Sequence, residues 1–139
     1  MLVNSREVEI EWGDCDAAGI VFYPRYFAMF DASTAYLLEK ALGMKKIAWT
    51  KKFGIVGIPM VDTGAKFIIP SRYGDVIRIE TQASEIRRSS FDIQHRVYKG
   101  EALAIEARET RVWAGVDPDN PDRIKGYAIP DEVVATLRG

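Results

Sequence analysis

Residues 25–43 read RYFAMFDASTAYLLEKALG, and this stretch decides the fold. Helix formers run without a break to Leu42, and Gly43 suits the position just after a helix C-terminus. Only three charged residues follow the initial arginine, so the helix is apolar nearly all round. Its apolar surface exceeds the stripe of about 100° found on a surface helix. We therefore expect other structure to wrap this helix, and dimerisation would cover the face that one small sheet leaves open.

A short strand and a tight loop precede the helix. Residues 7–12 alternate strictly, with Val8, Ile10 and Trp12 on one face and glutamates on the other, which is the period of a half-buried strand. Residues 13–19, GDCDAAG, are small or acidic and show no periodicity. The proline that follows suits the first turn of a helix. The sequence thus predicts a strand at 7–12 and a loop that leads into a helix N-terminus.

Most of the remaining chain is predicted to form a sheet. Runs rich in β-formers occupy residues 55–69, 76–86, 91–98 and 101–113. The last three are joined by connections too short for a parallel crossover, which predicts an antiparallel meander. Elsewhere we expect a short helix or turn at 44–53, a solvated turn at 117–122 and a short closing helix at 130–137. This order predicts an α+β fold, with a long central helix wrapped by a curled antiparallel sheet, in one domain over residues 1–139.

Composition and charge exclude several classes of function. The chain has 139 residues, 47% hydrophobic and 28% charged, as in an ordinary globular protein. Its 19 basic and 20 acidic residues give a net charge of -1, which provides no broad field for nucleic acid or an anionic membrane. One cysteine, Cys15, and one histidine, His95, cannot assemble a zinc site within one chain. No uncharged run approaches a membrane span, and a single cysteine fits a cytoplasmic protein.

The loop before the helix carries three candidates for chemistry. Asp14 and Asp16 flank Cys15. A carboxylate there can act as a nucleophile or general base, while the amides of the helix N-terminus offer dipoles to an oxyanion. Acidic residues before a helix are also common caps and turn formers, so spacing alone leaves both interpretations open. Cys15 is the weaker candidate, because two neighbouring carboxylates disfavour its thiolate.

Three further features each allow a structural and a functional interpretation. Asp31 lies on the apolar helix, where it needs either a hydrogen bond to the backbone, Tyr36 or Arg25, or a pocket to face. His95 falls on the apolar alternation of a predicted strand, which favours a core or interface histidine over a catalytic one. Residues 87–90, RRSS, place two guanidiniums and two hydroxyls in one turn. Such a turn either binds phosphate or is simply solvated.

The stretch 13–26, GDCDAAGIVFYPRY, resembles the motif of 4-hydroxybenzoyl-CoA thioesterases of the hot dog fold. The similarity extends through residues 70–75 and the RRSS turn to the last strand, so it covers nearly the whole chain. It implies an acyl-CoA thioesterase that acts on an aromatic substrate, most favourably 4-hydroxybenzoyl-CoA. It also implies a homo-oligomer, a dimer or a dimer of dimers, with sites between subunits and no metal or organic cofactor.

The resemblance also implies roles for particular residues. Asp16 matches the catalytic carboxylate, and the backbone N–H at Tyr23 would polarise the thioester carbonyl. Asp31 matches the helix aspartate that contacts the ring hydroxyl of the substrate. The turn that would grip the CoA phosphates consists of Arg87, Arg88, Ser89 and Ser90.

One further segment matches the acyl pocket of the family, and three other functions remain as alternatives. Residues 57–63, GIPMVDT, which include Gly57 and Pro59, match the segment that closes the acyl pocket from the partner subunit. Aliphatic acyl-CoA thioesterases of related sequence tend to carry glutamate where this chain has Asp31. A hot dog dehydratase or hydratase would need a histidine close to a carboxylate. A non-catalytic acyl-CoA binding module would not need Asp16.

Overall fold

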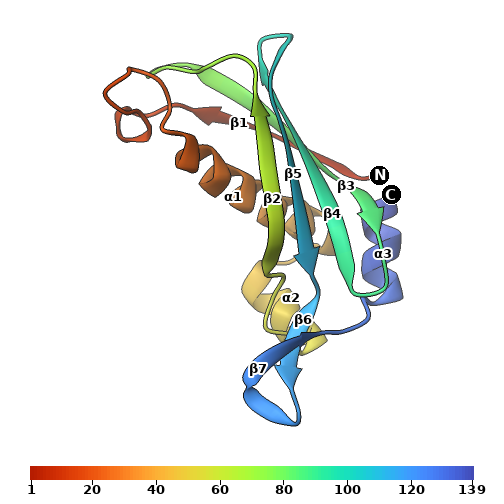
Figure 1. Ribbon diagram of the computed structural model, residues 1–139. Coiled ribbons are helices and arrows are strands. Elements are labelled where there is room, and N and C mark those ends of the chain that lie inside the picture. Colours follow the sequence, from red (N-terminus) through yellow and green to blue (C-terminus); the bar gives the residue numbers. More distant parts are fainter.

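A computed structural model describes all 139 residues of the chain. A five-stranded antiparallel sheet lies against one long helix, and two shorter helices and a hairpin complete the fold (Figure 1). The strands are β1 Val3–Glu9, β2 Met60–Phe67, β3 Val76–Ile86, β4 Ser90–Lys99, β5 Ala102–Val112, β6 Ala114–Asp117 and β7 Asn120–Gly126. The helices are α1 Tyr23–Leu42, α2 Lys46–Phe53 and α3 Asp131–Arg138, with a short 3₁₀ helix at Trp12–Asp14.

The main sheet has the strand order β1-β3-β4-β5-β2, and every neighbouring pair is antiparallel. Strands β3, β4 and β5 follow one another as a meander, which confirms the prediction from their short connections. The two edge strands are β1 and β2, and β2 pairs only with β5. The predicted α+β fold, one long helix against an antiparallel sheet, is confirmed.

Helix α1 lies close to its predicted bounds. It begins at Tyr23, has a proline in its first turn and ends at Leu42, after which Gly43 adopts a left-handed φ of 68°. Its buried residues recur every three or four positions and are Tyr26, Phe30, Ser33, Thr34, Leu37 and Leu38. The opposite face, which includes Tyr36, stays exposed. Other structure of the same chain therefore covers the helix on one side only.

Two clusters of buried side chains hold α1 against the sheet. One gathers around the stacked rings of Trp49 and Trp113, beside α2 and α3. The other gathers around Phe30 and the inward faces of β3, β4 and β5. Burial of one such large apolar side chain stabilises the fold by about 1.5–3 kcal/mol. These clusters set the positions of the α1 N-terminus and of Asp31.

The first strand differs from the prediction. It spans Val3–Glu9, and the predicted bounds of 7–12 are wrong. After β1, the Asp14 carboxylate accepts a backbone N–H at 2.8 Å and turns the chain into the 3₁₀ helix. Trp12 is consequently 79% exposed and packs edge-to-face on Tyr73 instead of facing the core.

The predicted solvated turn at 117–122 is the tip of a hairpin. Strands β6 and β7 pair as a separate two-stranded sheet, which projects from the end of the molecule near α2 (Figure 1). Prolines at 118 and 121 hide the strand pattern in the sequence. Of the predicted strand run 55–69, only β2 forms part of the sheet. The remaining predicted helices and strands are confirmed within a few residues.

Candidate active site

Asp16 lies in a tight turn between the 3₁₀ helix and α1. Its backbone N–H donates to the Ile20 carbonyl at 3.0 Å, and its carbonyl accepts the Gly19 N–H at 2.9 Å. Gly19 has a φ of 77°, the left-handed conformation that favours glycine. The side chain is exposed, and its Oδ1 accepts the Ala18 N–H at 2.9 Å. The turn thus holds the carboxylate by one oxygen and leaves the other open to solvent.

The chain reverses at this turn and enters α1. Cys15 bridges to Val21, and the Phe22 N–H donates to the Asp14 carbonyl at 2.8 Å. The Tyr23 N–H, the first amide of α1, donates no hydrogen bond within the chain. A free amide at the positive end of a 20-residue helix is a ready donor to an oxyanion. The reversal therefore places the predicted catalytic carboxylate and the predicted polarising amide on one small piece of backbone.

The neighbouring loop, residues 70–75, fixes this reversal in place. The Val21 N–H donates to the Ser71 carbonyl at 2.9 Å, and Arg72 Nη1 donates to the Gly19 carbonyl at 3.3 Å. A small apolar pocket of about 150 Å³ opens beside it. Its walls are Ile20, Val21, Tyr23, Tyr26, Phe67, Ile68, Ile69 and Pro70. An apolar acyl group can therefore lie next to the α1 N-terminus.

Asp31 has a partner that the sequence did not suggest. The side chain is 64% exposed, and its Oδ1 accepts a hydrogen bond from Arg111 Nη2 at 2.7 Å. Neither Tyr36 nor Arg25 bonds to it. The second oxygen, Oδ2, has no partner in the chain. Asp31 is thus an exposed, half-satisfied carboxylate and not the buried one that the apolar helix suggested.

The segment with Gly57 and Pro59 lies close to Asp31. The Ala114 N–H donates to the Gly57 carbonyl at 3.0 Å, and the Val112 N–H donates to the Pro59 carbonyl at 3.2 Å. Between them, the Ile58 carbonyl accepts a hydrogen bond from Arg111 Nη1 at 3.0 Å. Because the same guanidinium binds Asp31, the structure brings together the predicted acyl-binding residues.

Arg87 is neutralised within its own turn, between β3 and β4. Its Nε donates to Ser90 Oγ at 2.8 Å, and its Nη1 pairs with Asp92 at 3.1 Å and with Glu85 at 3.3 Å. The hydrogen bond to Asp92 raises the pKa of Arg87 above its ordinary value. Because two carboxylates balance this charge, Arg87 is a weaker ligand for phosphate than the sequence suggests.

Arg88 is the free cation of the same turn. Its side chain is exposed and forms no hydrogen bond or ion pair in the chain. Its carbonyl accepts the Ile129 N–H at 2.8 Å, and the Ser89 carbonyl accepts the Trp113 N–H at 2.8 Å. A fixed backbone with one unpaired guanidinium suits phosphate binding.

Asp16 and the turn at 87–90 lie at opposite ends of one chain. Strand β3 starts next to the loop that holds Asp16 and ends one residue before the turn (Figure 1). At about 3.3 Å per residue, its 11 residues span about 36 Å. One chain therefore does not bring the predicted catalytic and CoA-binding residues together, and a shared site would need residues of two chains.

Sequence reasoning missed Arg111 and Glu109. Both point inward from β5, in the alternation that also buries Ile105 and Ala107. Two charges on the inward face of a predicted strand were the signal that could have found them. His95 is fully buried, as predicted, with its Nε2 at 3.2 Å from Glu109 Oε2. This chain does pair a histidine with a carboxylate, but the pair is sealed inside the core.

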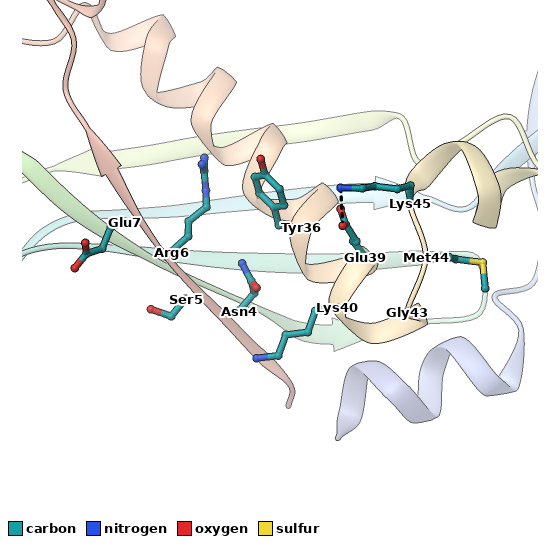
Figure 2. A pocket seen from close by; sticks show the side chains of 10 residues that line it. All are labelled: Asn4, Ser5, Arg6, Glu7, Tyr36, Glu39, Lys40, Gly43, Met44 and Lys45. Carbon is teal, nitrogen blue, oxygen red and sulfur yellow. Dashed lines mark ion pairs between the residues drawn. The ribbon is translucent and has the colours of Figure 1, made fainter.

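The largest groove lies elsewhere, between β1 and the C-terminal half of α1 (Figure 2). It encloses about 810 Å³ and is lined by none of the predicted site residues. Lys45 pairs there with Glu39 at 2.8 Å, and Lys40 donates to a β1 carbonyl at 2.8 Å. Both lysines are therefore paired within the chain. No group of three metal-ligating side chains occurs, and none of the helices is long and apolar enough to cross a membrane.

Comparison with known proteins shows the family to which this chain belongs. Residues 10–137 match the thioesterase-like superfamily, so the chain belongs to this superfamily, and its fold is the hot dog fold. It is 36% identical over 131 residues to the 4-hydroxybenzoyl-CoA thioesterase of Pseudomonas sp. strain CBS-3, with 90% of each chain covered. The structure of that enzyme matches with a TM-score of 0.87 at 34% identity, over 96% of this chain and 98% of the other.

Two further structures connect the fold with aromatic CoA esters. A mutant 4-hydroxybenzoyl-CoA thioesterase complexed with 4-hydroxybenzoyl-CoA has a TM-score of 0.86 at 33% identity, over 97% of this chain and 98% of the other. The gentisyl-coenzyme A thioesterase BH1999 has a TM-score of 0.82 at 27% identity, over 96% of this chain and 99% of the other. The resemblance carried by residues 13–26 is confirmed.

Proposed function

We propose that this protein hydrolyses the thioester of an aromatic acyl-CoA, with 4-hydroxybenzoyl-CoA favoured, to the free acid and CoA. The observation that carries the proposal is that one chain reversal holds both the Asp16 carboxylate, with one oxygen open to solvent, and the unpartnered Tyr23 N–H at the start of α1. A thioester carbonyl between them would meet an attacking group on one side and an oxyanion donor on the other. The relatives named for aromatic CoA esters support the choice of substrate.

Asp16 can drive the reaction in two ways. Its carboxylate attacks the carbonyl carbon and forms an acyl-enzyme anhydride that water then cleaves, or it takes a proton from an attacking water. Either way, negative charge develops on the carbonyl oxygen before the C–S bond breaks and the CoA thiolate leaves. The Tyr23 N–H and the positive end of α1 stabilise that charge. These groups supply attack and stabilisation together, so we propose that the reaction needs no metal or organic cofactor.

The acyl group is proposed to lie along α1. Asp31 follows Tyr23 by eight residues, a rise of about 12 Å on the same side of the helix. This length accommodates a benzoyl group with one hydrogen bond at its carbonyl and another at a ring hydroxyl. Asp31 Oδ2, which has no partner in the chain, would accept the ring hydroxyl. The segment with Gly57 and Pro59 would close the pocket.

The complete site is proposed to require a homo-oligomer, a dimer or a dimer of dimers. Strand β2 has a free edge, and Val61 and Phe67 expose apolar surface there. A second copy would cover this surface. It would also allow the Arg88 turn of one subunit to reach CoA bound at Asp16 of another, which the span of β3 prevents within one chain. In this proposal residues 1–139 form a single thioesterase domain, and the cytoplasmic location stays a prediction from the single cysteine.

The test is thioester cleavage measured with a free-thiol reagent over a panel of acyl-CoAs. We expect the kcat/KM for 4-hydroxybenzoyl-CoA to exceed that for benzoyl-CoA by about ten- to a hundredfold. The physical reason is that benzoyl-CoA would bury Asp31 Oδ2 without a hydrogen-bond donor. Asp31→Ala serves as the control and should erase the preference.

Other outcomes identify the alternatives. Preference for short aliphatic esters would assign the protein to the aliphatic thioesterases. Binding of acyl-CoA without release of thiol would indicate a non-catalytic module, for which Asp16 is dispensable.

Arg88→Ala is expected to raise KM for 4-hydroxybenzoyl-CoA while leaving kcat nearly unchanged. Phosphate contacts remote from the carbonyl contribute the same binding to ground state and transition state. KM of the wild type should also rise with salt, since exposed charges are screened, and the variant should flatten this dependence. Arg87→Ala should have the smaller effect, because Asp92 and Glu85 already neutralise Arg87.

The matched control is Arg138→Ala, which removes an exposed arginine of α3. A truncated thioester without the nucleotide should be cleaved equally by all these variants. If Arg88→Ala and Arg138→Ala give the same KM at low salt, the nucleotide binds away from this turn.

A further inference from the structure

Arg111 joins three separate parts of the fold through one guanidinium. Its side chain is 4% exposed and lies between α1 and the sheet. Nη2 donates to Asp31 Oδ1 at 2.7 Å, and Nη1 donates to the Ile58 carbonyl at 3.0 Å. Nε donates to Glu109 Oε1 at 2.8 Å. The planar fork of arginine can serve three acceptors in fixed directions, which the single ammonium of lysine cannot.

Glu109 in turn is held by a buried polar cluster. Thr34 Oγ1 donates to its Oε1 at 2.6 Å, and His95 Nε2 lies 3.2 Å from its Oε2. The other ring nitrogen of His95 hydrogen-bonds Thr81 Oγ1 at 2.8 Å, and the ring stacks on Phe30. Burial alone would raise the pKa of Glu109, but hydrogen bonds from its neighbours outweigh this effect and lower the pKa to about 2. Glu109 is therefore a fixed anion.

This arrangement determines how Arg111 meets Asp31. An arginine free of other partners binds a carboxylate through two parallel N–H···O bonds, which occupy both oxygens. Here Glu109 accepts the hydrogen bond from Nε, and the Ile58 carbonyl accepts the one from Nη1. Only Nη2 is left for Asp31, which therefore accepts a single hydrogen bond. Asp31 Oδ1 is fixed as a result, and Oδ2 is left to accept a hydrogen bond from outside the chain.

We propose that Arg111, held by Glu109 and His95, is a positioning residue for substrate specificity. It orients Asp31 so that one carboxylate oxygen accepts the hydroxyl of the acyl ring, and it ties the pocket-closing segment to the same point through Ile58. This inference rests on the proposed function, because it concerns recognition of a hydroxylated aromatic acyl group. Arg111 itself does not touch the thioester.

The experiment compares 4-hydroxybenzoyl-CoA with benzoyl-CoA in Arg111→Met. The ratio of their kcat/KM values should fall about ten- to a hundredfold, to the level of Asp31→Ala, because only 4-hydroxybenzoyl-CoA loses a hydrogen bond at its ring hydroxyl. If Arg111 had only a structural role, its replacement would lower kcat/KM for both substrates by the same factor and leave their ratio unchanged. Arg96→Met is the matched control, since Arg96 is an exposed arginine of β4 whose ion pair faces solvent.

Arg111→Met leaves Glu109 as a buried charge without its cation and could prevent folding. The double variant Arg111→Met with Glu109→Gln removes both charges together and should show the same loss of ratio. In an Asp31→Ala background, Arg111→Met should change the ratio no further, because the two residues act through one contact.

The outcomes separate this inference from the proposed function. A folded Arg111 variant that keeps the wild-type ratio within threefold overturns the role of Arg111 and leaves the thioesterase function standing. A wild type that cleaves both esters equally well likewise overturns the role of Arg111 and leaves the thioesterase function standing. A wild type that cleaves neither ester overturns both proposals.

Discussion

Asp16→Asn is expected to lower kcat by about 10² to 10⁴-fold, because it removes the group that attacks the carbonyl or accepts the proton of water. The turn itself should survive, since the asparagine Oδ1 can still accept the Ala18 N–H that Asp16 Oδ1 accepts at 2.9 Å. The affinity for the CoA ester should therefore stay close to that of the wild type. Single-turnover cleavage measures the chemical step, and equilibrium binding of the uncleaved ester measures the affinity.

Asp14→Asn is the matched control for this substitution. Asp14 lies two residues away, and its Oδ2 accepts the Glu11 N–H at 2.8 Å, just before the 3₁₀ helix, so it serves the geometry of the loop. We expect its kcat to fall far less. Turnover of Asp16→Asn within threefold of wild type would exclude Asp16 as nucleophile or base.

Glu109→Gln is expected to lower the free energy of unfolding at pH 7 by about 3 kcal/mol, because it removes the buried anion at Arg111 Nε and leaves the exposed Asp31 as the only carboxylate partner of Arg111. Its effect should depend on pH. Glu109 has its pKa lowered to about 2 in the folded protein, from 4.5 in the unfolded chain. A lowered pKa contributes stability that is fully present above the unfolded value and is lost as the pH falls through the folded value. The stability difference between the two proteins should therefore shrink between about pH 5 and pH 2.

Urea unfolding at several pH values between 2 and 7 measures this dependence. Glu101→Gln, at an exposed position of the β4–β5 turn, is the control and should leave both the stability and its pH dependence unchanged. A stability difference between wild type and Glu109→Gln that is independent of pH would contradict the assignment of Glu109 as a buried anion.

The sequence predicted the parts of the fold that depend on local pattern. The α1 helix and the meander follow from residue periodicity and from short connections, which need no knowledge of distant neighbours. The first strand was misplaced because the alternation of 7–12 continues past the point where Asp14 turns the chain. The β6–β7 hairpin was missed because its prolines resemble those of a loop.

The partners of the candidate site residues could not be predicted in the same way. Arg111 is 80 residues from Asp31 in sequence, and their contact exists only after the sheet has formed against α1. The opposite placement of Asp16 and Arg88 follows from the length of β3 and not from any motif. The resemblance proposes these residues as parts of one site, and only the fold shows that one chain separates them.

The proposed use of a backbone amide at Tyr23, and not of a side chain, affects how thioesterases of this fold can diverge in substrate. Every amino acid except proline carries a backbone N–H, so the group proposed to polarise the carbonyl places almost no demand on the side chain at this position. The exposed Tyr23 ring is therefore free to change with the acyl group. If the proposed role of this amide holds, new substrates can be acquired through side chains along α1, while the donor is inherited with the shape of the backbone.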